Sequence, residues 1–113
     1  MSISEADYDA LALPELRALI QTLDELELSG VECELSSDIL TLELDGGARY
    51  VVNSHRAARQ IWMAAERSAW HFDWEPARSA WIAKKTGDEL WSTLSRVLTN
   101  KLGRPVELTR APS

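Results

Sequence analysis

Five carboxylates gather where a predicted helix ends and a predicted strand begins. They are Asp24, Glu25, Glu27, Glu32 and Glu34. Carboxylates at the C-terminal end of a helix oppose its dipole and repel one another, so the arrangement costs stability. Oxygen ligands without histidine or thiolate suit hard cations such as Mg, Ca, Mn or iron, and an exposed row of them would bind such ions weakly. The alternative is a solvated face that protects an edge strand from aggregation.

Tryptophan is the second candidate feature. Four tryptophans fall on predicted strands and one on a predicted helix: Trp62, Trp70, Trp74, Trp81 and Trp91. The strand position two before Trp62 holds Gln60, whereas Ile61 and Met63 point to the opposite side. Trp62 is therefore predicted to project from an uncovered sheet face, where it would be a binding hot spot unless neighbouring side chains cover it. Trp91 lies in an apolar helical stripe and is predicted to be core.

The sequence predicts no catalytic residue. His55 falls in a predicted loop and His71 in a predicted strand, and no serine or cysteine in a nucleophile setting accompanies them. Cys33 is the single cysteine, so an internal disulfide and a Cys/His zinc cluster are both excluded. Cys33 alternates with acids and is predicted to be a small buried hydrophobe, since neighbouring carboxylates raise a thiol pKa.

Charge is unevenly divided along the 113 residues. Positions 1–45 carry twelve acids and one arginine, a net charge of −11, whereas the remainder carries eleven basic residues and six acids, a net charge of +5. This asymmetry predicts two faces with different partners. No apolar run is long enough to span a membrane, and the acidic N-terminus does not resemble an Arg-rich presequence. We therefore expect a cytoplasmic protein without a membrane partner.

The predicted elements run in the order helix, strands, helix. Apolar residues from Leu16 to Leu26 recur at helical spacing, and Pro14 should either kink this helix or mark its start. Alternation then predicts six strands, at 31–35, 40–45, 48–53, 59–64, 69–74 and 80–83. Thr86 is the predicted N-cap of a second helix, with Glu89 completing a capping box, and Gly103 ends that helix.

This order predicts an α+β fold in a single domain spanning 1–113. Each helix is apolar on one side only, and short connections favour antiparallel strands. Both helices should therefore pack on one face of one sheet, which leaves the other face for solvent or a partner.

The sequence resembles the frataxin family, specifically its bacterial members. The resemblance is carried by the spacing from Asn53 to Trp62 and by the run from His71 to Trp74, and it extends more loosely over residues 8–108. It implies a frataxin-like two-layer sandwich, with two helices on one face of an antiparallel sheet. Ile20 and Gln21 stand where many bacterial members carry acids, so the acidic row is shorter here.

The resemblance also implies function. Iron, as Fe2+ or Fe3+, would bind weakly to the five surface carboxylates, with no tightly bound cofactor. The chain would dock on the cysteine desulfurase and scaffold protein that build iron-sulfur clusters, as a regulator or an iron donor. It would be a monomer, with iron-induced oligomers as a further expectation. The matching partner-binding residues are Asn53, Arg59, Gln60 and Trp62.

Two other functions compete with this one. A single-stranded nucleic-acid binding module could stack bases on exposed sheet Trp and Arg, which the basic second part of the chain favours. The net charge of −6 and the lack of an RNP-like signature oppose it. A ferroxidase is disfavoured because no histidine-carboxylate metal geometry is evident.

Overall fold

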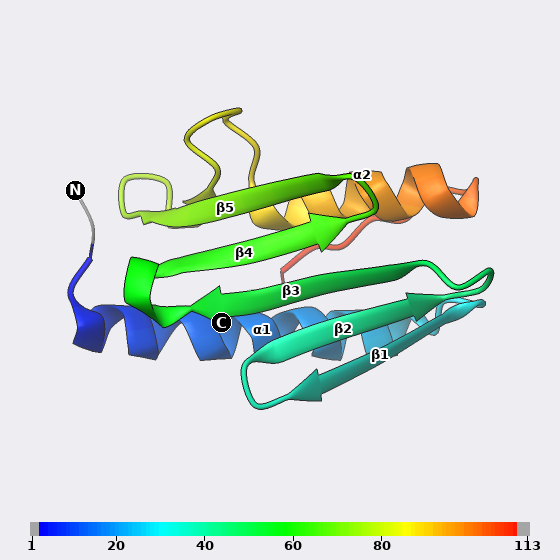
Figure 1. Ribbon diagram of the computed structural model, residues 1–113, viewed down its shortest axis with the longest axis horizontal. Coiled ribbons are helices and arrows are strands. Elements are labelled where there is room, and N and C mark those ends of the chain that lie inside the picture. The colour runs from blue at the N-terminus through cyan, green and yellow to red at the C-terminus, as the bar shows by residue number, and fades with distance from the viewer. Residues whose placement is uncertain (1–2, 111–113) are drawn as a thin grey trace.

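The segments with helical and alternating apolar patterns form two helices and one six-stranded sheet, as the sequence predicts. The computed structural model describes residues 3–110. The elements are α1 (Glu5–Leu26), β1 (Val31–Ser36), β2 (Ile39–Leu44), β3 (Arg49–His55), the short 3₁₀ helix η1 (Arg56–Ala58), β4 (Gln60–Ala65), β5 (Ser68–Glu75), β6 (Ala80–Ile82) and α2 (Leu90–Leu102). The strands are antiparallel and neighbour one another in chain order. Both helices cover the same face of the sheet (Figure 1), which confirms the predicted α+β class.

Helix α1 begins at Glu5, before Pro14, whereas one of the two sequence interpretations started the helix at Pro14. Ser4 caps it by accepting a hydrogen bond from the Asp7 backbone N–H at 3.1 Å, and the helix continues through Pro14 to Leu26. Tyr8 and Ala12, upstream of the proline, are buried one helical turn apart, so core packing holds this first part in place. A start at Pro14 is therefore wrong. Leu26 was predicted to complete the apolar stripe, but it is 42% exposed beyond the packed part of the helix.

Helix α2 is capped by a different residue from the one predicted. Glu89, not Thr86, is the N-cap, and its carboxylate accepts from the backbone N–H groups of Trp91 at 2.7 Å and Ser92 at 3.1 Å. The chain is still extended at Glu89 because this residue forms a β-bridge with Ile82. Gly103 ends the helix with a φ of 71°, as predicted.

Cross-strand pairing assigns the two faces of the sheet. Leu42 is buried between Cys33 and Tyr50, so this set faces the helices. The opposite face, called the open face below, presents a row across four neighbouring strands in register: Ile39, Asn53, Trp62 and His71. His55 is the last residue of β3 and not part of a loop, which corrects the sequence prediction.

Within residues 3–110, neither α1 nor α2 is both long and apolar enough to cross a membrane.

Candidate functional site: the open face and the acidic edge

Trp62 stands at the centre of the open face between two imidazole rings. The His55 ring stacks on the indole with centroids 3.8 Å apart and planes 13° apart. The His71 ring stacks with centroids 4.2 Å apart and planes 12° apart. Trp62 is half-buried as a result. The prediction that it projects from the open face is correct, and the alternative of partial cover by neighbouring side chains is also met. The sequence did not identify His55 and His71 as the residues that cover it.

The indole is also fixed at its N–H group. Trp62 Nε1 donates to Gln60 Oε1 at 2.8 Å, and Gln60 Nε2 donates to the two carboxylate oxygens of Asp73 at 3.2 and 3.3 Å. Gln60 and Asp73 are direct cross-strand partners on β4 and β5. Because Asp73 accepts from the amide nitrogen, the amide oxygen of Gln60 is left facing the indole.

The structure brings together three of the four predicted partner-binding residues. Asn53 is the direct cross-strand partner of Trp62, and Gln60 contacts the indole. Arg59 lies apart from them. It follows η1 with a φ of 54°, and its Nη1 donates to the Ile3 carbonyl at 3.0 Å, so it ties the N-terminal segment to the start of β4.

The sequence interpretation missed four open-face residues. His55, His71 and Asp73 contact Trp62 or Gln60, and Ile39 is 45% exposed in the same row. Their positions follow once the strands are paired in register, since residues two apart on one strand share a face. The alternation along each strand indicated which face these residues occupy. The register between strands, which places them beside Trp62, could not be predicted from the sequence.

The five predicted metal-binding carboxylates lie along one edge of the molecule, and we call this set the acidic edge. All five are exposed, and β1 is an edge strand, as expected. They divide into two groups. Glu32 and Glu34 alternate with the helix-facing Cys33 and so lie on the open face, whereas Asp24, Glu25 and Glu27 belong to the end of α1 or follow it.

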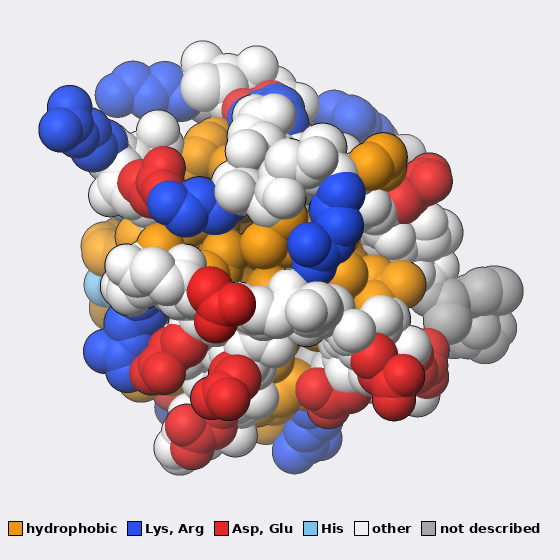
Figure 2. Space-filling model, turned by 90° about the vertical axis from the view of Figure 1, so that its right-hand side faces the viewer, with side chains coloured by type: hydrophobic (Ala, Val, Ile, Leu, Met, Phe, Trp, Pro, Cys, Tyr) orange, Lys and Arg blue, Asp and Glu red, His pale blue; other side chains and the backbone are white. Residues whose placement is uncertain are grey.

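Further acids extend this edge. Glu43 is the cross-strand partner of Glu32, and with Asp45 these residues line a cavity of about 500 Å³ at the start of β1. Directly opposed like charges are unfavourable, and Arg49 relieves Glu43 with a contact of 3.6 Å. Figure 2 shows acidic side chains gathered in the lower half of this end of the molecule, below an apolar band. In the described part of the chain, no three Asp, Glu, His or Cys side chains form a group that could hold one metal ion.

Cys33 lies beside this edge as an unreactive thiol. It is half-buried and unpaired in the described chain. Burial, with a smaller contribution from the Asp24 carboxylate, raises the pKa of the Cys33 thiol to about 11. The thiol is therefore protonated at neutral pH and is a poor nucleophile or metal ligand.

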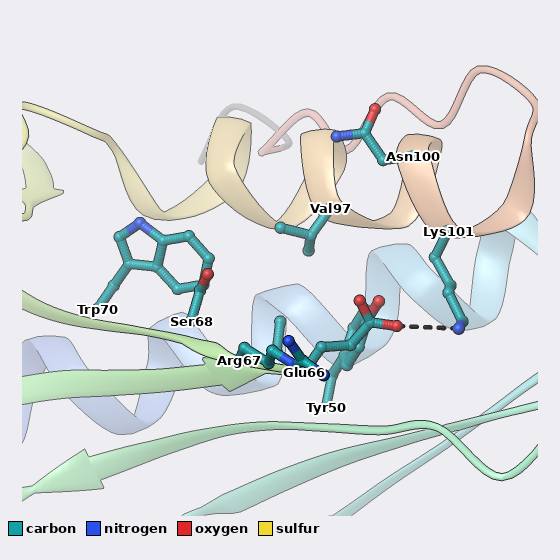
Figure 3. A pocket seen from close by; sticks show the side chains of 9 residues that line it. Tyr50, Glu66, Arg67, Ser68, Trp70, Val97, Asn100 and Lys101 are labelled. Atoms are coloured by element: carbon teal, nitrogen blue, oxygen red, sulfur yellow. Dashed lines mark ion pairs between the residues drawn. The ribbon is translucent and has the colours of Figure 1, made fainter.

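A larger cavity lies elsewhere, between α2 and the β4–β5 hairpin. It measures about 790 Å³ and is lined by Tyr50, Trp70 and Val97 among others. Figure 3 shows that a Glu66–Lys101 ion pair, with oxygen and nitrogen 2.9 Å apart, crosses one end of it. Burial, and then the Glu66 carboxylate, raises the pKa of the Tyr50 hydroxyl. The sequence interpretation named no residue of this cavity as part of a site.

The nucleic-acid interpretation requires an indole face on which a base can stack. At Trp62 both faces are in contact with imidazole rings. Trp70, Trp74 and Trp81 alternate with open-face residues and point to the helix side. The geometry of the sheet therefore argues against base stacking on this surface.

Comparison with known proteins agrees with the fold. A family model described as a frataxin-like domain matches residues 1–104. The iron-sulfur cluster assembly protein CyaY of Thioalkalivibrio sulfidiphilus is 31% identical over 107 residues, which cover 94% of this chain and 100% of that protein. The protein of the same name from Paraburkholderia phymatum is 31% identical over 106 residues, covering 94% and 98%.

Solved structures show the same architecture. A frataxin from Psychromonas ingrahamii matches with a TM-score of 0.84 over 95% of this chain and 99% of that one, at 21% identity. Yeast frataxin matches with a TM-score of 0.70 over 87% and 82%, at 25% identity. With a family model that spans nearly the whole sequence and relatives that match from end to end, this chain belongs to the frataxin family.

Proposed function

We propose that this protein binds iron and docks on the cysteine desulfurase and scaffold complex, where it regulates or supplies iron to iron-sulfur cluster assembly. The observation that carries the docking proposal is the ordered Trp62 at the centre of a sheet face that no helix covers. A large aromatic side chain with polar neighbours on an uncovered face is typical of an interface hot spot. Relatives named as iron-sulfur cluster assembly proteins support a partner in that pathway.

In this proposal iron is a cargo held on the acidic edge. The donors are exposed carboxylates, which suit a hard cation such as ferric iron. Because the described acids form no closed cage, one or two carboxylates and water would complete the shell of each ion. Such binding is weak and readily reversed, which suits delivery or sensing better than catalysis. We propose no enzymatic step, a cytoplasmic location, and a monomer that iron can drive into oligomers.

The docking surface would consist of Asn53, Gln60 and Trp62. These three lie next to one another on β3 and β4. Arg59 was carried into this set by the resemblance, and we propose it as a further partner-binding residue, next to Gln60 in the chain and bonded to the Ile3 carbonyl.

A binding experiment tests the docking proposal. The purified cognate cysteine desulfurase is titrated with the wild-type protein, with and without ferrous iron, and with Trp62→Ala. We expect Trp62→Ala to weaken binding by about 2 kcal/mol or more. The control is Arg78→Ala, an exposed change in the β5–β6 connection. Equal affinities for wild type and Trp62→Ala would refute docking through the open face.

Iron binding is tested separately by NMR. Iron should broaden the backbone amide signals between Asp24 and Glu34 first, and the triple variant Asp24→Asn, Glu25→Gln, Glu27→Gln should weaken this effect. Glu107→Gln neutralises an exposed acid on the C-terminal segment and serves as the control. Broadening that persists unchanged in the triple variant would place the iron elsewhere.

A further inference from the structure

The two rings on Trp62 determine how a partner can touch it. We propose that His55 and His71 are positioning residues that clamp the indole, so that a protein partner meets only the edge of the ring. This inference rests on the proposed docking function and defines the chemistry of the contact. It assigns roles to two histidines and one aspartate that the resemblance to frataxins did not include.

The clamp closes on both faces of the indole. Trp62 is on β4, and His55 and His71 come from its two neighbours, β3 and β5. Both imidazoles are nearly parallel to the indole and within 4.2 Å of its centroid. Two rings cannot occupy the same space above one centroid, so they must lie on opposite faces.

A second restraint acts in the plane of the ring. The chain of hydrogen bonds from Trp62 through Gln60 to Asp73 ties the indole N–H to β5. His55 adds no comparable polar anchor at Nδ1, because this buried nitrogen has no hydrogen-bond partner within residues 3–110. Stacking on the Trp62 indole is therefore a principal contact of the His55 ring.

These contacts define the partner surface that fits. The accessible part of the indole is an apolar edge, and the imidazole edges and the Gln60–Asp73 pair lie beside it. In the same row, Ile39 adds an exposed apolar side chain. The complementary surface is a narrow apolar slot bordered by carbonyl or carboxylate groups, into which the ring edge inserts. A nucleobase or a flat aromatic partner, which would need the indole face, does not fit.

Holding the side chain in its bound rotamer should improve affinity. A tryptophan that is not clamped loses rotamer freedom when it binds, and this loss costs free energy. Removing one ring of the clamp should therefore weaken binding roughly threefold to tenfold. The effect acts through Trp62, so it should disappear in a Trp62→Ala background.

The test combines mobility with affinity. We compare wild type, His71→Ala and His71→Phe, since Phe keeps a flat ring and removes the ring nitrogens. His55→Ala provides a second, independent opening of the clamp. For each variant, ¹⁵N relaxation reports the order parameter of the Trp62 Nε1–H group, and titration gives the Kd for the cognate cysteine desulfurase. We expect both alanine variants to lower the order parameter and the affinity, and His71→Phe to restore both.

Distinct outcomes would overturn the proposal. If Trp62→Ala binds like wild type, the docking function itself fails. If Trp62→Ala weakens binding while His71→Ala and His55→Ala change neither mobility nor affinity, docking stands and the clamp is wrong. If His71→Phe keeps the indole ordered yet binds as weakly as His71→Ala, His71 contacts the partner directly. If oligo-dT binds the wild type and this binding is lost in Trp62→Ala, the ring face is open to bases and edge-on presentation is refuted.

Discussion

Trp62 and Trp91 have similar polar contacts and opposite surroundings. Each donates its indole N–H to a side-chain oxygen, Trp62 to Gln60 at 2.8 Å and Trp91 to Glu15 at 2.6 Å. Trp91 is 6% exposed within the core, whereas Trp62 is half-buried between two imidazoles on the face that no helix covers. Residue type and hydrogen bonding therefore do not distinguish a core tryptophan from a displayed one. What distinguishes them is whether a layer of helices packs over the tryptophan.

The largest effect should come from removing the core tryptophan. Trp91→Ala should lower the free energy of unfolding by about 3 to 5 kcal/mol, because it opens a cavity between α2 and the rest of the core. It also leaves the buried Glu15 carboxylate without its indole donor. Urea denaturation followed by circular dichroism measures the loss. A loss below that of Trp62→Ala would show that the two environments have been assigned the wrong way round.

A smaller loss should follow when the partner of Trp91 is changed. Glu15 is 2% exposed and also pairs with Arg110 at 3.4 Å. Glu15→Ala leaves the Trp91 N–H unpaired in the core, which should cost about 1 to 3 kcal/mol. Glu15→Gln keeps an acceptor oxygen and is the matched control. Equal losses for the two variants would mean that the carboxylate charge matters more than the hydrogen bond.

The displayed tryptophan should contribute less to folding. Trp62→Ala removes two stacked pairs, each worth about 0.5 to 1.5 kcal/mol, and should lower the free energy of unfolding by roughly 1 to 3 kcal/mol. This exceeds the small loss expected for a fully solvated ring, because His55 and His71 cover it. The same denaturation experiment measures it. A loss as large as that of Trp91→Ala would make Trp62 a structural residue first.

The smallest effect should come from the acidic edge, far from the Trp91 core. Neutralising Asp24, Glu25 and Glu27 removes like-charge repulsion worth about 0.2 to 0.5 kcal/mol per pair, so the Tm should rise slightly. Added salt should raise the Tm of the wild type by screening the same charges. Indole NMR signals of Trp62 and Trp91 should not move. If they do, the acidic edge is coupled to one of the two tryptophans.

Local patterns predicted most of the fold. Strict alternation from Val31 onward placed all six strands, and it put Trp62 and Ile61 on opposite faces. Gly103 ended α2 where a left-handed residue was needed. These predictions succeeded because periodicity and turn chemistry depend on residues that are close in sequence.

Other features depended on contacts between distant segments. The buried Glu15 lies 76 residues from Trp91, whose indole is its hydrogen-bond donor. Arg59 donates to the Ile3 carbonyl, 56 residues away in the sequence. The cap of α2 moved to Glu89 because a bridge to Ile82 keeps that segment extended.

The sequence by itself determined the elements, the faces of the strands and the presence of clustered acids. Only the tertiary structure decided that His55 and His71 close on Trp62, and that Glu43 is paired with Glu32 at the acidic edge. The physical reason is register. Alternation says which side of a strand a residue occupies, but its neighbours across the sheet are set by how whole strands pair, and that depends on the packing of the complete core.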